Sequence, residues 1–425
     1  MTKKKKNPFD ITLDLNEKDL EELFEPFDPL RKYEKFNFPE LEAIDEPFDP
    51  LDFDYLFSFK DEIVVPILEN YFRAELIGAD KVPDKGPLIM ASNHSGNAFP
   101  HDAIVLDGLL WREHGMDKKA KFRSVFSPSL TAVWWMRPYG LDDWWRHCGG
   151  VDMTFSNFDY LLRKNYKVIY YPEGIPGIGK GFTRRYQLQH FYSSFVVLAS
   201  RYNVPIYPVF TVNAEWVNPV SITFKWLDRF SNRLLRIPFF PVPIVFLALL
   251  FPFMFYLAFP ANMKFVIGNP IDVRGIMKEM GIDHQNPTKE QLQDTATRIH
   301  DIMQEGLNKA VEEYGQVPYD IKNWYRQMKS LGWKAFKYLP TGWPYTFIRH
   351  YRNLNRKPAR NRFIKWLRDA DILSYYIPFG WFLLALFRKV RKPPYGYRGL
   401  SKKERREREG RYLWLLDKRP LPTKH

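Results

Sequence analysis

The sequence is poor in cysteine, with Cys148 as the only one among 425 residues. One cysteine excludes an internal disulfide framework and a thiolate-rich zinc site, and it fits a reducing compartment. The 33 prolines disfavour a long uninterrupted helical array or coiled coil. The four lysines at 3–6 are followed by polar and acidic residues, so the apolar stretch of a secretory signal is missing.

Apolar residues make up 45% of the chain and aromatic residues 17%, a composition that excludes a disordered protein. The formal net charge of +14 points to an anionic partner, either nucleic acid or phospholipid headgroups. We favour the phospholipid, because nucleic-acid binding would not explain two long uncharged apolar segments described below.

The charge is unevenly distributed. Residues 7–58 hold 16 acidic and four basic side chains, whereas residues 388–424 hold 14 basic and four acidic ones. The motif Glu-Pro-Phe-Asp-Pro-Leu occurs at 25–30 and again at 46–51, and two copies are too few for a solenoid. We therefore predict an acidic N-terminal arm over 1–58, joined to the main domain by a linker near 52–72 that includes a short helix at 63–72.

Short apolar runs bounded by Pro, Gly or Asn predict buried strands. They lie at 88–92, around Val125, and at 167–171, 204–212 and 263–268. Between them are stretches with helical spacing, most clearly at 299–311, where apolar residues recur on one face. The alternation predicts an α/β fold in which helices cover a largely buried mixed sheet.

Two uncharged segments are candidates for membrane contact. Residues 237–260 would be long enough to span a bilayer, but five prolines favour a buried or interfacial hairpin. Residues 372–387 are directly followed by a cationic cluster, which suits an interfacial anchor on anionic lipid. A core helix with a solvated basic end remains the alternative for this second segment.

The chemistry begins in the segment 93–102, which follows a predicted strand. His94 would emerge at the end of that strand, where α/β sheets place ligand sites. Turns at Gly96 and Pro100 can bring Asp102 back to the imidazole. A carboxylate on one ring nitrogen fixes the tautomer and leaves the other nitrogen as a base. For His94 taken alone, an ordinary loop histidine is the favoured interpretation.

The motifs around His94 have counterparts in a known family. The motifs occur along the chain in the order that the family has. They are the stretch 81–87, Asn93-His94 with a downstream Asp, Tyr171-Pro172-Glu173-Gly174, the run 204–209 and the turn 267–271. Together they resemble the PlsC-like glycerolipid acyltransferase superfamily, the lysophosphatidate acyltransferase type, over about residues 70–315. The first motif resembles a looped variant, because the acid usually found five residues after the histidine is replaced by Phe99.

The resemblance implies transfer of an acyl group from acyl-CoA or acyl carrier protein to a hydroxyl of a glycerolipid such as lysophosphatidate. No bound cofactor or metal is expected. His94 would be the general base and Asp102 its orienting carboxylate, with Asp107 as the fallback. Backbone N–H groups in the 95–97 turn or near Gly174 would stabilise the oxyanion.

The resemblance also implies an acceptor site. Glu173 and Gly174 would hold the acceptor or brace its loop. The family's usual second motif ends in a phosphate-binding arginine, but none occurs in 149–154. Lys180, Arg184 and Arg185 are the nearest cations that would take its place.

The predicted organisation is an acidic arm at 1–58, an acyltransferase domain at 59–315 and a basic, aromatic helical extension at 316–425. We expect a membrane-associated protein at the cytoplasmic face, with the phospholipid surface, a lipid acceptor and a thioester donor as partners. Two alternatives stay open: a neutral acceptor such as diacylglycerol, and a catalytically inactive member of the same fold.

Overall fold

The computed structural model describes residues 53–96, 99–126, 145, 148–153, 155–224, 226–228, 230–231, 240–354, 361 and 369–390. The acidic arm up to residue 52 and the basic end from 391 lie outside the described residues. So do Asn97 and the predicted second-motif residue Thr154.

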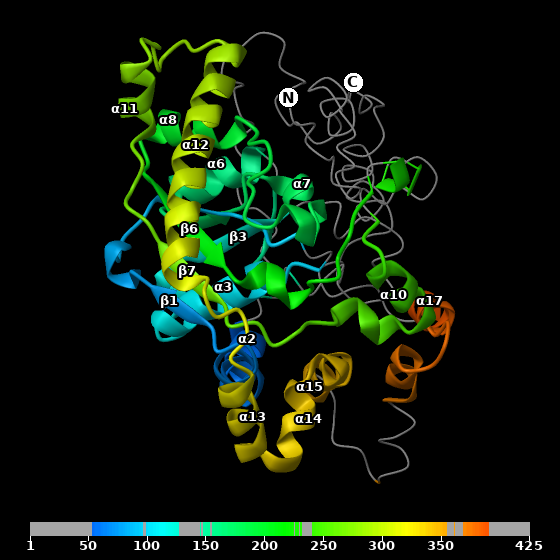
Figure 1. Cartoon of the computed structure of the whole chain (residues 1–425). Coiled ribbons are helices and arrows are strands. Elements are labelled where there is room, and N and C mark those ends of the chain that lie inside the picture. The colour runs from blue at the N-terminus through cyan, green and yellow to red at the C-terminus, as the bar shows by residue number, and fades with distance from the viewer. Residues whose placement is uncertain are drawn as a thin grey trace, which may run out of the picture.

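Within the described residues, seven strands form one mixed sheet in the order β1-β7-β6-β2-β5-β3-β4 (Figure 1). All neighbouring strands are parallel except β6 and β7, which are antiparallel. The strands are β1 Glu75–Ile77, β2 Leu88–Ser92, β3 Phe122–Phe126, β4 Val151–Asp152, β5 Lys167–Tyr170, β6 Ile206–Val212 and β7 Lys264–Ile267. The predicted α/β class and all five predicted strands are confirmed, and β1 and β4 are additional.

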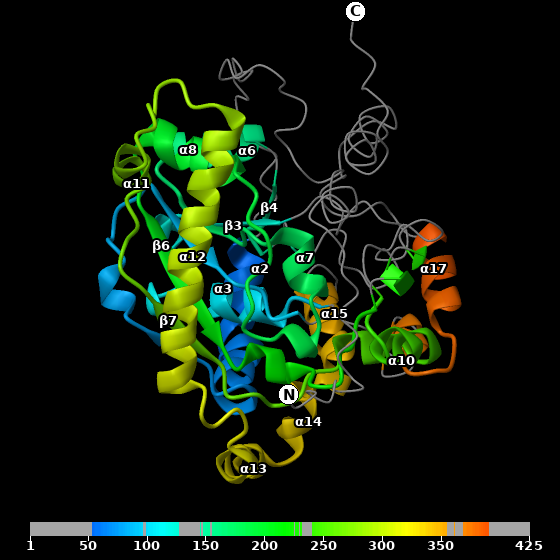
Figure 2. The ribbon, with the colours of Figure 1, turned by 45° about the horizontal axis from the view of Figure 1, so that its top comes forward.

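Helices cover both faces of the sheet, as Figures 1 and 2 show. The helices are α2 Phe53–Phe59, α3 His101–Glu113, α6 Phe155–Arg163, α7 Gly174–Gly179, α8 Ser194–Tyr202, α10 Ile244–Leu250, α11 Val273–Glu279, α12 Lys289–Tyr314, α13 Ile321–Ser330, α14 Ala335–Tyr338, α15 Trp343–Leu354 and α17 Trp381–Val390. The predicted amphipathic helix is part of α12, whose first turn is closed by a capping box between Thr288 and Gln291.

The central strand β2 explains why the sheet is covered on both sides. All five of its residues are buried. Leu88 and Met90 pack into a core with α3 and the C-terminal helices, whereas Ile89 and Ala91 pack into a second core with α6, α8 and α12. A near-continuous apolar run is typical of a strand buried on both faces.

The segment predicted as a linker is part of the core, so that prediction is wrong. Residues 53–71 are helical, and Leu56, Ile63, Ile67, Leu68 and Tyr71 are buried. The predicted helix is present as η3 Ile67–Tyr71. The boundary predicted at residue 58 falls within α2.

The described part of the C-terminal extension is helical, as predicted. It packs against the N-terminal helices: Trp343 lies 5.9 Å from both Tyr71 and Phe72 between ring centroids. Tyr338, Ile372 and Tyr375 belong to the same buried cluster. The extension therefore completes one core of the sheet.

The two uncharged segments are broken into short helices and lie side by side (Figures 1 and 2). Residues 237–260 include α10 and η9 Pro252–Tyr256, and residues 372–387 include most of η12 Ala370–Tyr375 and α17. The N–H of Phe379 donates to the carbonyl oxygen of Leu250 at 2.7 Å. Among the residues that the structure describes, no helix is both long and apolar enough to cross a bilayer.

Candidate active site

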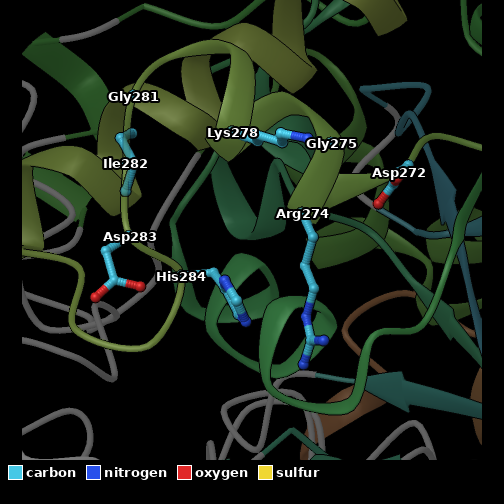
Figure 3. A pocket seen from close by; sticks show the side chains of 8 residues that line it. All are labelled: Asp272, Arg274, Gly275, Lys278, Gly281, Ile282, Asp283 and His284. Atoms are coloured by element: carbon cyan, nitrogen blue, oxygen red, sulfur yellow. The ribbon is translucent and has the colours of Figure 1, made fainter.

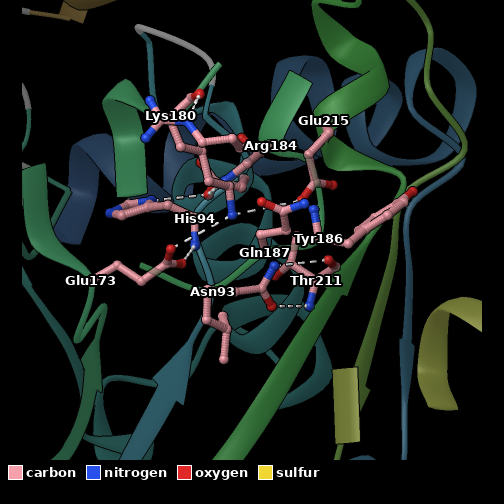
Figure 4. A network of polar contacts seen from close by, with 12 residues as sticks. Asn93, His94, Glu173, Lys180, Arg184, Tyr186, Gln187, Thr211 and Glu215 are labelled. Atoms are coloured by element: carbon pink, nitrogen blue, oxygen red, sulfur yellow. Dashed lines mark hydrogen bonds and ion pairs between the residues drawn. The ribbon is translucent and has the colours of Figure 1, made fainter. Parts of the chain in front are cut away.

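The candidate site lies where three neighbouring parallel strands end. His94 follows β2, Glu173 follows β5, and Glu215 follows β6. Since the carboxyl ends of parallel strands meet at one edge of a sheet, their loops converge there. Figure 4 shows the polar network that results.

Asn93 fixes the exit of the chain from β2. Its side-chain oxygen accepts the N–H of Thr211 at 2.8 Å, and its amide donates to the carbonyl oxygen of Thr211 at 3.0 Å. The side chain thereby continues the hydrogen-bonded pairing of β2 with β6 beyond the last strand residue. The backbone that leads into His94 is thus held in place by β6.

His94 and Asp102 come together as predicted. The distance from His94 Nδ1 to Asp102 Oδ2 is 3.0 Å, and both side chains are buried. The N–H of Ser95 donates to the same carboxylate oxygen at 3.0 Å. Asp102 stands in the first turn of α3, where a negative charge is stabilised by the helix dipole. His94 Nε2 is left as the ring nitrogen that can take a proton.

The environment keeps Asp102 ionised. Burial alone would raise its pKa, but the neighbouring His94 ring and the N–H groups of Ser95 and Ala103 outweigh burial and hold the pKa below its usual value. The carboxylate can therefore orient the imidazole and stabilise its protonated form.

An aromatic ring and a closely packed helix shape the surroundings of His94. The ring of Tyr171 stacks on the His94 ring, with centroids 4.0 Å apart and planes 13° apart. Helix α7 approaches closely on another side: a Cβ at Gly177 would lie 3.0 Å from His94 Cβ and 2.6 Å from Glu173 Cβ. Gly177 therefore allows α7 to pack against the loop of His94.

Asp107, the fallback carboxylate, faces elsewhere. It accepts a hydrogen bond from the hydroxyl of Ser124, and burial raises its pKa to about 7.

His101 does not compete with His94 for the role of base. It is buried, its Nε2 faces the carbonyl oxygen of Tyr256 at 3.4 Å, and burial lowers its pKa to about 4.

Glu173 braces the loop of His94. One carboxylate oxygen accepts the N–H of His94 and the other accepts the N–H of Gln189, both at 2.8 Å. Its side chain is completely buried. Of the two roles predicted for Glu173, this geometry corresponds to the bracing of the loop.

Lys180 does not face an acceptor, which corrects the expectation for this residue. Its ammonium group is fully buried, 3.6 Å from Glu173 Oε2 and 3.9 Å from Glu215 Oε1. Burial raises the pKa of Glu215 to about 7, although the charge of Lys180 acts in the opposite direction. Sequence reasoning missed Glu215, since no motif surrounds it.

The other two candidate cations differ in exposure. Arg184 donates to the carbonyl oxygen of Lys180 at 2.9 Å and to the side chains of Gln189 and Thr223. Arg185 is exposed, and its guanidinium carbon lies 4.9 Å from the centre of the Phe182 ring. Of the three candidate cations, Arg185 is the one at the surface.

Two of the backbone donors expected to form the oxyanion hole are engaged in other hydrogen bonds. The N–H of Ser95 donates to Asp102, and the N–H of Gly174 donates to the carbonyl oxygen of Tyr171 at 2.9 Å. Neither N–H therefore points to an oxyanion, and the prediction is wrong for these two groups. Asn97, the end of the predicted turn, lies outside the described residues.

A hollow beside α11 is separate from this site (Figure 3). Its lining includes Arg274, Lys278 and His284. Arg274 donates to the carbonyl oxygens of Ser200 and Arg201, so it holds the end of α8. Among the residues that the structure describes, no group of three or more His, Cys, Asp or Glu side chains comes together to hold a metal ion.

Comparison with known proteins found a matching family model and several similar proteins. Residues 73–212 match the family model described as Acyltransferase. Uncharacterized proteins of Mycobacterium tuberculosis and Mycobacterium bovis are 28% identical over 193 residues, which cover 44% of this chain and 51% of each relative. An uncharacterized protein of Mycobacterium leprae is also 28% identical, with 44% and 49% covered. The chain thus spans about half the length of these curated relatives.

Among solved structures, the 1-acyl-sn-glycerophosphate (LPA) acyltransferase PlsC from Thermotoga maritima is similar at 14% identity. The match covers 61% of this chain and 84% of that chain, with a TM-score of 0.33.

Proposed function

We propose that the chain transfers a fatty acyl group from a thioester to a hydroxyl of a glycerolipid. Residues 73–212 match the acyltransferase family model, in agreement with the resemblance found in the sequence. The donor is acyl-CoA or acyl carrier protein, and the acceptor is lysophosphatidate or a related lysophospholipid. The observation that carries this proposal is the buried contact between His94 Nδ1 and Asp102 Oδ2.

In the proposed reaction, His94 Nε2 takes the proton of the acceptor hydroxyl as its oxygen attacks the thioester carbonyl. Asp102 holds the ring and stabilises the imidazolium, as the carboxylate does in a serine hydrolase triad. The C–S bond then breaks, and the departing thiolate takes the proton from His94. A positioned general base contributes on the order of 10²–10⁴ in rate, and the remainder comes from holding donor and acceptor together.

We further propose a membrane surface as the place of the reaction. On α10, Phe246, Leu249 and Leu250 are exposed, and on or beside α17 so are Phe379, Phe382, Leu383 and Leu386. These seven residues form what we call the α10–α17 surface. The segment after α10 continues towards the site, because Phe255 and Tyr256 pack against Phe99 with ring centroids 5.5 and 5.2 Å apart.

One observation favours a second candidate, a neutral acceptor such as diacylglycerol. Lys180 is buried between carboxylates, and the donors of Arg184 are directed to protein oxygens. Only Arg185 among these three cations is placed to meet a phosphate at the surface.

The test is to incubate the purified full-length chain with acyl-CoA, and separately with acylated acyl carrier protein, and to follow the release of free thiol. Lysophosphatidate and diacylglycerol are offered in turn, and the lipid product is identified by mass spectrometry. Thiol release that depends on an acceptor, together with the acylated lipid, supports the proposal. Its absence with every lipid and with both donor types would show an inactive member of the fold.

A further inference from the structure

Helix α13, helix α14 and the turn between them each carry one exposed aromatic side chain. Tyr325 is 61%, Trp333 100% and Phe336 58% exposed. Single exposed aromatic residues are common on protein surfaces, but here three lie within twelve residues, accompanied by the exposed Ile321.

Cations alternate with these aromatic residues. Lys322, Arg326, Lys329, Lys334 and Lys337 are all exposed. No aspartate or glutamate occurs between residues 321 and 368, a stretch with 13 Lys and Arg residues. The local charge is therefore strongly positive, without acidic neighbours in the same segment to compensate it.

The opposite side of this segment is anchored in the protein. The Trp324 ring meets the Tyr71 ring edge-on at 6.2 Å, and Met328 and Tyr338 are buried. The hydroxyl of Tyr338 donates to the carbonyl oxygen of Glu62 at 3.1 Å. Since one side is packed, the exposed aromatic and basic side chains lie on the other side of the segment. Helices α13 and α14 lie towards the lower end of the ribbon in Figures 1 and 2.

We propose that this surface, the α13–α14 face, docks on an anionic phospholipid bilayer. The α13–α14 face comprises Ile321, Lys322, Tyr325, Arg326, Lys329, Trp333, Lys334, Phe336 and Lys337. Tryptophan and tyrosine favour the headgroup level of a membrane, and lysine and arginine near the surface are attracted by anionic lipids. The inference rests in part on the proposed function, which places a lipid acceptor in the site.

A bilayer explains more of the structure than a nucleic acid or an acidic protein does. Basic and aromatic side chains would also suit single-stranded nucleic acid. However, the same chain exposes the α10–α17 surface, whose segments 237–260 and 372–387 contain no charged residue. Uncharged apolar surface is of no use against a polyanion but inserts favourably at the headgroup boundary.

The experiment is flotation of the full-length protein with vesicles of phosphatidylcholine, alone or mixed with phosphatidylserine. One variant combines Trp333→Ala with Phe336→Ala, and a second combines Lys334→Gln with Lys337→Gln. A matched control combines Lys278→Gln on α11 with Arg298→Gln on α12, and Met280→Ala is the control for lost apolar surface; these three side chains are exposed. Circular dichroism verifies that each variant is folded, and the complete exposure of Trp333 means that its loss removes no packing.

We expect the aromatic pair to weaken binding to both kinds of vesicle. The lysine pair should lower partitioning into phosphatidylserine vesicles roughly tenfold or more and hardly affect pure phosphatidylcholine. The controls should bind as the wild type does. Wild-type flotation of both test variants, or an equal loss in the controls, would overturn the proposal.

Two further readouts separate this inference from its alternatives. If the lysine pair loses binding to single-stranded RNA or acyl carrier protein while flotation is unchanged, the face serves that partner and the inference is wrong. Acyl transfer to a soluble short-chain lysophosphatidate should be unchanged in every variant. A protein without transfer activity that still shows the expected flotation pattern would refute the proposed function and support the docking face.

Discussion

The backbone N–H of His94 donates to Glu173 Oε1 at 2.8 Å, which ties the loop after β2 to the loop after β5. These two loops carry the Asn93-His94 motif and the Tyr171-Pro172-Glu173-Gly174 motif, and His94 and Glu173 are 79 residues apart along the chain. Glu173 thus holds His94 through its backbone, while Asp102 holds it through its ring. The backbone N–H and the imidazole ring of His94 are therefore each fixed by a carboxylate group.

His94→Ala should lower turnover by about 10²–10⁴-fold, because the variant loses its general base. Thiol release from acyl-CoA measures the effect, and circular dichroism should show an intact fold. His101→Phe is the control, since it replaces a buried ring by one of similar size. A dead His101 variant beside an active His94 variant would show that the base is misassigned.

Asp102→Asn should reduce turnover roughly 10²-fold, because the amide no longer fixes the imidazole tautomer or stabilises its charge. Asp107→Asn should leave turnover close to that of the wild type, since Asp107 bonds to Ser124 instead. Steady-state kinetics of the two variants under identical conditions provide the comparison. The reverse order of activities would contradict the assignment of Asp102.

Lys180→Met should destabilise the protein by about 3–5 kcal/mol, because it leaves two buried carboxyl groups without their cation. Urea unfolding measures the change. Adding Glu215→Gln should restore part of the loss, since the double variant keeps only Glu173 as a buried charge in this network. A double variant as unstable as the sum of the two single variants would mean that Lys180 and Glu215 do not interact.

Stability should fall in acid because of His101. Its pKa is lowered from 6.5 to about 4 in the folded protein, so the unfolded chain binds more protons between these values. The contribution of His101 to the free energy of unfolding is therefore complete above pH 6.5. It is lost as the pH falls towards 4, and the total loss is on the order of 3 kcal/mol. His101→Phe should flatten this part of the stability curve, as measured by urea unfolding at several pH values. An unchanged slope would show that other groups cause the acid sensitivity.

Arg185→Ala should raise the KM for lysophosphatidate several-fold if the acceptor phosphate meets the exposed guanidinium, because arginine binds phosphate bidentately. The KM for diacylglycerol should be unaffected. Arg201→Ala, an exposed arginine at the end of α8, is the control. A wild-type enzyme that acylates diacylglycerol and ignores lysophosphatidate would instead favour the neutral acceptor.

The strands that the sequence predicted are those with long apolar runs. β1 and β4 were missed, because they have three and two residues and no such run. The pairing of His94 with Asp102 was predictable from motif order and turn residues. The burial of Lys180 was not, since lysine is almost never fully buried without partners and one of its two partners, Glu215, lies outside every motif. The antiparallel pairing of β6 with β7 likewise has no local signal.

The packing of Trp343 against Tyr71 and Phe72 has a consequence for synthesis on the ribosome. The N-terminal helices and β1 emerge first, but the core that covers them is completed only by residues up to Leu384. Until then, the face of the sheet that carries Leu88 and Met90 lacks part of its cover. The nascent chain therefore exposes apolar surface until residues 343–384 have left the ribosome.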